Sequence, residues 1–148
     1  MFTLAKTYLL VTAIVWSGYG VAVAFFPDII VVLTGIGIEH WTADLEVRAW
    51  YLCTEIGLGI LAFYGYKEPE NYMKINFLIW MVIFTVLVAF RFAGTWYFES
   101  YWDLRPGLEH LPDSYHIATA YVYELPSMLL FIWFWIKRDE LVPKKISG

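Results

Sequence analysis

Residues 46–62 read EVRAWYLCTEIGLGILA, an apolar run with an acidic residue, Glu55, near its middle. At helical spacing Arg48, Glu55, Gly59 and Ala62 fall on one stripe, so a pair of opposite charges shares a face with two small residues. An ionisable group inside an apolar helix is costly in lipid, and it is tolerated where it faces protein or water. The run therefore predicts a membrane-spanning helix with a buried polar site.

The composition of the chain agrees with a membrane location. Of its 148 residues, 60% are apolar and 20% are aromatic, which is more apolar than a typical soluble domain. The length predicts a single domain, residues 1–148. No cluster of Lys and Arg is interleaved with aromatic residues, so we expect no nucleic-acid partner.

Four apolar segments are long enough to cross a hydrocarbon core of roughly 30 Å as α-helices. They cover about residues 4–26, 45–66, 74–98 and 115–136. Ala22-Val23-Ala24 resembles a signal-peptide cleavage site, but we expect the first segment to stay attached as a span. Ile29 to Leu33 is apolar and too short to cross, which predicts a short interfacial helix after the first span. The predicted fold is an all-α, integral-membrane four-helix bundle.

Two local features bear on how the predicted spans pack. Gly18 and Ala22, like Gly20 and Ala24, have the four-residue spacing that lets helices approach closely. That spacing serves equally for packing within the bundle and for a seam between two copies. Pro126 lacks an N–H, so it predicts a kink in the fourth span.

The distribution of basic residues predicts the orientation. One side of the predicted bundle holds both termini with Lys6, Lys67, Lys74, Lys137, Arg138, Lys144 and Lys145, whereas the other side holds only Arg48 and Arg105. Cytoplasmic loops of membrane proteins carry an excess of Lys and Arg. We therefore expect a multi-pass protein of the bacterial inner membrane with both termini in the cytoplasm.

The same topology brings three charged residues to a similar depth. Glu55 lies about ten residues below the outer end of its span, so roughly 15 Å deep. Arg91 and Glu124 lie about seven to nine residues from their outer ends, so roughly 10–14 Å deep, with Arg48 above them. We expect Arg91 to contact Glu55, Glu124 or both. Such a layer either fixes the register of the helices or leaves a carboxylate able to take a proton, a cation or a polar ligand.

Metal-binding and catalytic motifs are not indicated. His40, His110 and His116 lie on the outer side near acidic residues, but their spacing matches no known metal motif, so we expect no metal there. The lone Cys53 can form no intramolecular disulfide, and no base stands beside it to make it a nucleophile. The sequence indicates no cofactor and does not predict an enzyme.

A short pattern in the second span resembles a known family. The pattern consists of Glu46, Arg48 and Tyr51, then Glu55-Ile56-Gly57-Leu58-Gly59, with Pro27 after the first span, an Arg late in the third and a Glu in the fourth. It resembles small four-helix bacterial inner-membrane proteins of a domain-of-unknown-function family, and more distantly the DoxX-like group. The loop at residues 99–114 is longer than that pattern requires. The resemblance implies the architecture alone and gives no catalytic residue.

These observations predict a non-catalytic accessory or ligand-binding protein of the inner membrane, as a subunit of a larger membrane complex. The alternative is a small transporter or channel that handles protons, cations or a polar solute through the Glu/Arg layer. The expected partners are the lipid bilayer and either other membrane subunits or further copies of this chain.

The orientation can be tested with reporter fusions that are active on only one side of the membrane. A fusion after Gly148 and a fusion within residues 99–114 should give opposite signals, the first of them cytoplasmic, because of the asymmetry of Lys and Arg. A periplasmic signal at Gly148 would show the orientation to be wrong.

Overall fold

The computed structural model describes residues 1–28, 41–98 and 120–142, and this part of the chain is helical without strands. The elements are α1 (Phe2–Phe25), α3 (Trp41–Lys67), α4 (Pro69–Phe98), the π-helical turn η2 (Ala120–Glu124), α6 (Leu125–Ile136) and the single turn α7 (Arg138–Leu141). The predicted all-α class is therefore confirmed for the described residues. The predicted interfacial helix at Ile29 to Leu33 lies outside them.

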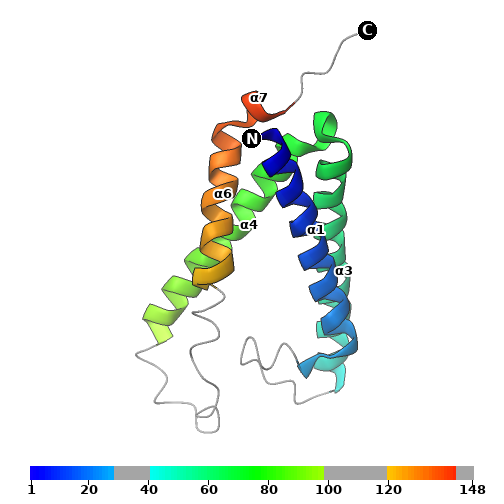
Figure 1. Cartoon of the computed structure of the whole chain (residues 1–148). Helices are drawn as coiled ribbons and strands as arrows, with labels where there is room; N and C mark the ends of the chain where they lie inside the picture. The colour runs from blue at the N-terminus through cyan, green and yellow to red at the C-terminus, as the bar shows by residue number, and fades with distance from the viewer. Residues whose placement is uncertain (29–40, 99–119, 143–148) are drawn as a thin grey trace.

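The helices form two antiparallel pairs, α1 with α3 and α4 with α6 (Figure 1). The pairs meet at the end that holds the N-terminus and α7, and they diverge towards the other end. Only Glu68 separates α3 from α4, and Pro69 begins α4, where a missing N–H costs nothing. The Glu68 N–H donates to the Tyr64 carbonyl at 2.8 Å, and the Glu68 carbonyl accepts from the Tyr72 N–H at 3.0 Å. This tight turn places α4 back along the bundle.

Two glycines set the distance between α1 and α3. A Cβ atom added to Gly20 would lie 2.7 Å from the Glu55 Cβ, and one added to Gly59 would lie 2.9 Å from the Ala13 carbonyl oxygen. Both distances are shorter than van der Waals contact, so only glycine fits at these crossings. Gly20 therefore packs within the bundle, whereas nothing lies within 4 Å of an added Cβ at Gly18.

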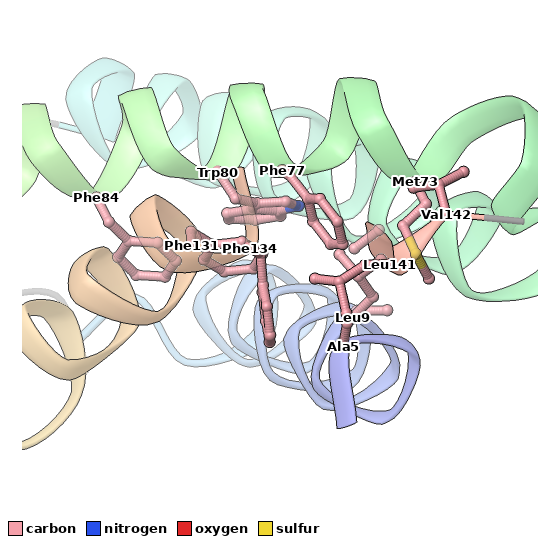
Figure 2. Packing of buried hydrophobic residues seen from close by; sticks show 12 residues of the cluster. Ala5, Leu9, Met73, Phe77, Trp80, Phe84, Phe131, Phe134, Leu141 and Val142 are labelled. Atoms are coloured by element: carbon pink, nitrogen blue, oxygen red, sulfur yellow. The ribbon is translucent and has the colours of Figure 1, made fainter. Parts of the chain in front are cut away.

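An aromatic core holds α4 and α6 together. The Phe77 and Phe134 rings stack with centroids 5.2 Å apart, and the Phe84 and Phe131 rings stack at 5.8 Å. Trp80 lies between them in the row along α4 (Figure 2). Aromatic pairs of this kind contribute about 0.5–1.5 kcal/mol each beyond the burial of their area.

The segment after α6 folds into a short helical turn that packs on the core. Residues 138–141 form α7, and both Leu141 and Val142 are buried in the core cluster. Lys74 of α4 forms an ion pair with Asp139 of α7 at 2.7 Å. The Lys74 ammonium lowers the pKa of the Asp139 carboxyl, so the pair is intact at neutral pH and is lost as the pH falls through that lowered pKa. The pair is exposed to solvent, so burial of the two apolar side chains holds α7 in place.

Much of the surface of the helices is apolar. Exposed large side chains lie along every long helix, among them Ile14 of α1, Phe63 of α3 and Phe90 of α4, the last with 76% of its surface exposed. Within the described residues, α1 and the Pro69–Phe90 part of α4 are long and apolar enough to cross a membrane, and Tyr121–Ile136 is a shorter apolar helix. α3 is not among the helices of the described residues that meet both conditions. Two of the four predicted spans, the first and the third, are thus long and apolar enough to cross a membrane.

The seam between α1 and α3 can be tested with one methyl group. Gly59→Ala should lower the free energy of unfolding by about 1–3 kcal/mol, because the new methyl meets backbone atoms of α1 that cannot move aside. Thermal unfolding in detergent would measure this change. Gly57→Ala is the matched control on the same helix, since its Cβ would enter open space and should leave stability unchanged or raise it by up to about 1 kcal/mol. Equal stability of the two variants would contradict the close seam.

Candidate polar site between the helices

Glu55 is buried on the face of α3 that packs against α1. Only 8% of the surface of Glu55 is exposed. Its Cβ atom lies next to Gly20, where the backbone of α1 closely approaches α3. Its Oε2 atom accepts no hydrogen bond from any residue that the structure describes. A buried carboxylate oxygen without a donor is rare, and in an apolar environment it is costly. In the predicted polar layer, Glu55 is therefore a buried acid whose carboxylate lacks a donor among the described residues.

Tyr123 of η2 accepts a hydrogen bond from α1. The Trp16 Nε1–H donates to the Tyr123 hydroxyl oxygen at 3.1 Å, which links α1 to η2. Because an indole can only donate, this bond leaves the phenolic proton of Tyr123 available to an acceptor. The Tyr123 hydroxyl also interacts electrostatically with Glu124 and, more weakly, with Glu55.

Glu124 is the last residue of the π-helical turn and retains 5% of its exposure. The turn lies just before Pro126, at the place where the sequence predicts a kink. Since the proline has no N–H, the regular hydrogen-bond pattern cannot continue through it, and the chain widens for one turn instead. Such π-helical turns occur frequently at functional sites. The η2 turn contains Tyr123 and Glu124 as consecutive residues.

Of the two arginines in the predicted polar layer, only Arg48 has a side chain that the structure describes. The Arg48 Nη1 atom donates to the Ala24 carbonyl at 2.8 Å, near the C-terminal end of α1, where a cation is favourable. This bond ties Arg48 to the backbone of α1. Arg91 lies within α4, but its side chain is outside the described part of the structure. Its contact with Glu55 or Glu124 stays a prediction.

The predicted histidines His40, His110 and His116 all lie outside the described residues. Among the residues that are described, no group of three or more His, Cys, Asp and Glu side chains could hold a metal ion. Cys53 is exposed on α3 as a free thiol.

The structure adds polar residues that sequence analysis did not single out. The Tyr8 and Ser127 hydroxyls lie 2.6 Å apart and join α1 to α6. Asn76 is fully buried, and its Nδ2 donates to the carbonyls of Leu61 and Tyr72 at 2.9 and 3.0 Å. An amide within the apolar third segment was a visible signal for Asn76. Tyr8 had no such signal, because tyrosine is common throughout this chain.

Comparison of the chain with protein-family models, with curated proteins and with solved structures gives no match. The resemblance to four-helix inner-membrane proteins therefore stays a prediction, and the site is interpreted from its own geometry.

The bond between Trp16 and Tyr123 generates a prediction about stability. Tyr123→Phe leaves the indole N–H of Trp16 without an acceptor, so it should cost about 1–3 kcal/mol in the free energy of unfolding. Tyr121→Phe is the matched control, because it makes the same change in the same turn at an exposed side chain. Denaturation of both variants in detergent would measure the difference. Equal stabilities would show that the buried bond contributes nothing.

Proposed function

We propose that this chain is a non-catalytic, multi-pass protein of the bacterial inner membrane that binds a ligand at Glu55, Tyr123 and Glu124, and that it acts as an accessory subunit of a larger membrane complex. The observation that carries the proposal is the burial of Glu55 with a carboxylate oxygen that no described residue bonds. In a purely structural network, each buried acceptor would be satisfied by a donor. A ligand would supply the missing donor or charge.

The membrane part of the proposal is supported by the exposed apolar surface. Two apolar side chains on different helices illustrate this: Val122 of η2 is 78% exposed and Ile14 of α1 is 64% exposed. Apolar surface spread over several helices is unfavourable in water and favourable in contact with lipid. The described basic residues Lys6, Lys74 and Lys137 belong to the end shared by the N-terminus and α7 (Figure 1), which supports two cytoplasmic termini.

The accessory role is supported by the kind of residues present. The site offers carboxylates and a phenol, but sequence analysis finds no activated nucleophile and no phosphate-binding loop beside them. Large apolar side chains also lie exposed along the long helices, and other subunits would pack on them as well as lipid does. These features favour a protein that binds a ligand and other subunits over an enzyme that converts a substrate.

Transport is the second candidate function, and one observation favours it. Glu55, Tyr123 and Glu124 are three groups that can carry a proton, on two separate elements, α3 and η2, and the phenol interacts electrostatically with both acids. Proton pathways through membrane proteins use groups of this kind. A transporter would also need access from both sides of the membrane, which an accessory protein does not need.

The proposal can be tested by purifying the full chain from its native membrane in a mild detergent. Co-purifying proteins and small molecules would be identified by mass spectrometry for the natural chain, for Glu55→Gln and for Glu70→Gln. The expected result is a stoichiometric partner that the natural chain and Glu70→Gln retain, together with a bound species that Glu55→Gln loses. Glu70 is the matched control because it is an exposed carboxylate near the start of α4.

Two outcomes would contradict the proposal. A natural chain that purifies without any stoichiometric partner would remove the accessory role. Proton or cation flux in vesicles that contain this chain alone, abolished by Glu55→Gln and kept by Glu70→Gln, would establish transport in its place.

A further inference from the structure

Two buried polar atoms on neighbouring turns of α4 have no hydrogen-bonding partner among the described residues. Asn76 and Trp80 are both fully buried, yet the Asn76 Oδ1 atom accepts no bond from these residues and the Trp80 Nε1 atom donates none to them. The two residues are four positions apart in the helix, so their side chains lie on the same face. Buried polar atoms without partners are rare in folded proteins, and each of them is costly.

The side-chain amide of Asn76 is held in one orientation. Its Nδ2 atom donates to the Leu61 carbonyl of α3 at 2.9 Å and to the Tyr72 carbonyl of α4 at 3.0 Å. An amide turned the other way would present its oxygen to these two carbonyl oxygens, which cannot donate. The Oδ1 atom is thereby kept as an acceptor in the core, and it needs a donor.

The Trp80 ring is also held in place by its neighbours. It packs against Trp16 of α1 and Phe131 of α6, with ring centroids 4.9 and 6.2 Å apart. In Figure 2 its nitrogen lies on the side of the ring towards Phe77, in the turn of α4 that also contains Asn76. The donor of Trp80 and the acceptor of Asn76 are therefore brought towards each other along the helix.

A buried hydroxyl of α1 lies near the same level. A Cβ atom added to Gly65 would lie 3.0 Å from the Leu9 Cδ1 and 2.7 Å from the Asn76 Nδ2, so Leu9 of α1 is a neighbour of Asn76. Thr12 follows Leu9 by three residues, on the same face of α1, and is only 1% exposed. The Thr12 hydroxyl donates to the Tyr8 carbonyl at 2.8 Å, and its oxygen can still accept.

We propose that one water molecule binds between Asn76, Trp80 and Thr12. It accepts from the indole N–H of Trp80, and it donates to the Asn76 Oδ1 atom and to the Thr12 hydroxyl oxygen. Internal waters typically make about three hydrogen bonds to buried polar groups that the protein leaves without partners. The ligand must both accept and donate, and all three side chains are buried in a packed core, which favours the smallest molecule that does both.

Bound in this way, the water connects three helices. Thr12 belongs to α1 and Trp80 to α4, while Asn76 of α4 already bonds the backbone of α3. A bridging water is nearly as favourable in enthalpy as a direct hydrogen bond. The site is separate from Glu55 and does not depend on the proposed function.

Nuclear magnetic resonance of the full chain in deuterated detergent, with ¹⁵N-labelled tryptophan, tests this inference. The peak that Trp80→Phe removes identifies the indole proton of Trp80. The expected result is an Overhauser cross-peak between this proton and the water resonance, while the proton itself exchanges only slowly with heavy water. Asn76→Leu should lose the cross-peak because the water loses an acceptor. Asn71→Leu, at an exposed asparagine of the same helix, is the matched control and should keep it.

Thr12→Val keeps the shape of the side chain and covers the case in which Asn76→Leu does not fold. It should retain a weaker cross-peak, because two of the three partners remain. A cross-peak that Thr12→Val abolishes would arise from the threonine hydroxyl and would overturn the inference. The inference would also be overturned by a natural chain without the cross-peak, or by a folded Asn76→Leu variant that keeps it unchanged.

Discussion

The contact between the backbones of α1 and α3 is the constraint on which the rest of the structure depends. Close packing and hydrogen bonds hold helices together where the hydrophobic effect does not drive their association, as in lipid. Gly20 and Gly59 provide that packing, since each faces atoms of the other helix without room for a methyl group. The stripe of α3 that contains Glu55 is thereby turned inward. A wider seam would expose the carboxylate on the surface of the helix pair instead of burying it against α1.

The second helix pair is held differently, by stacked aromatic rings between α4 and α6. Three side-chain hydrogen bonds of the described residues connect it to the first pair: one between Tyr8 and Ser127, one between Trp16 and Tyr123, and one from Asn76 to the Leu61 carbonyl. The first two come from α1 and reach the segment that contains Pro126. Together the three bonds fix how far the helices of one pair can slide along those of the other. The polar site is thus a consequence of the same contacts that set the register.

Sequence periodicity was sufficient for the helices and for the inward face of α3, because Glu55, Gly59 and Ala62 share one stripe at helical spacing and are all buried. Periodicity could not identify Tyr123 as the hydrogen-bond partner of Trp16, since aromatic residues occur throughout the chain and only the tertiary fold distinguishes one from another. It also could not place Leu141 and Val142, because two apolar residues carry no periodic signal. Similarly, the preference of Arg48 for a backbone carbonyl depends on where α1 ends, which no pattern within α3 reveals.

The burial of the segment after α6 also sets an order of events during synthesis. Leu141 and Val142 belong to the same core cluster as Ala5 and Leu9 of α1, so residues that leave the ribosome early meet residues that leave it late (Figure 2). Until α6 and α7 have been made, the start of α1 lacks these neighbours. Contacts between such distant parts of a chain slow folding. The end of the bundle near the N-terminus is therefore the last to close, and an early-folded half with α1 and α3 paired would wait for it.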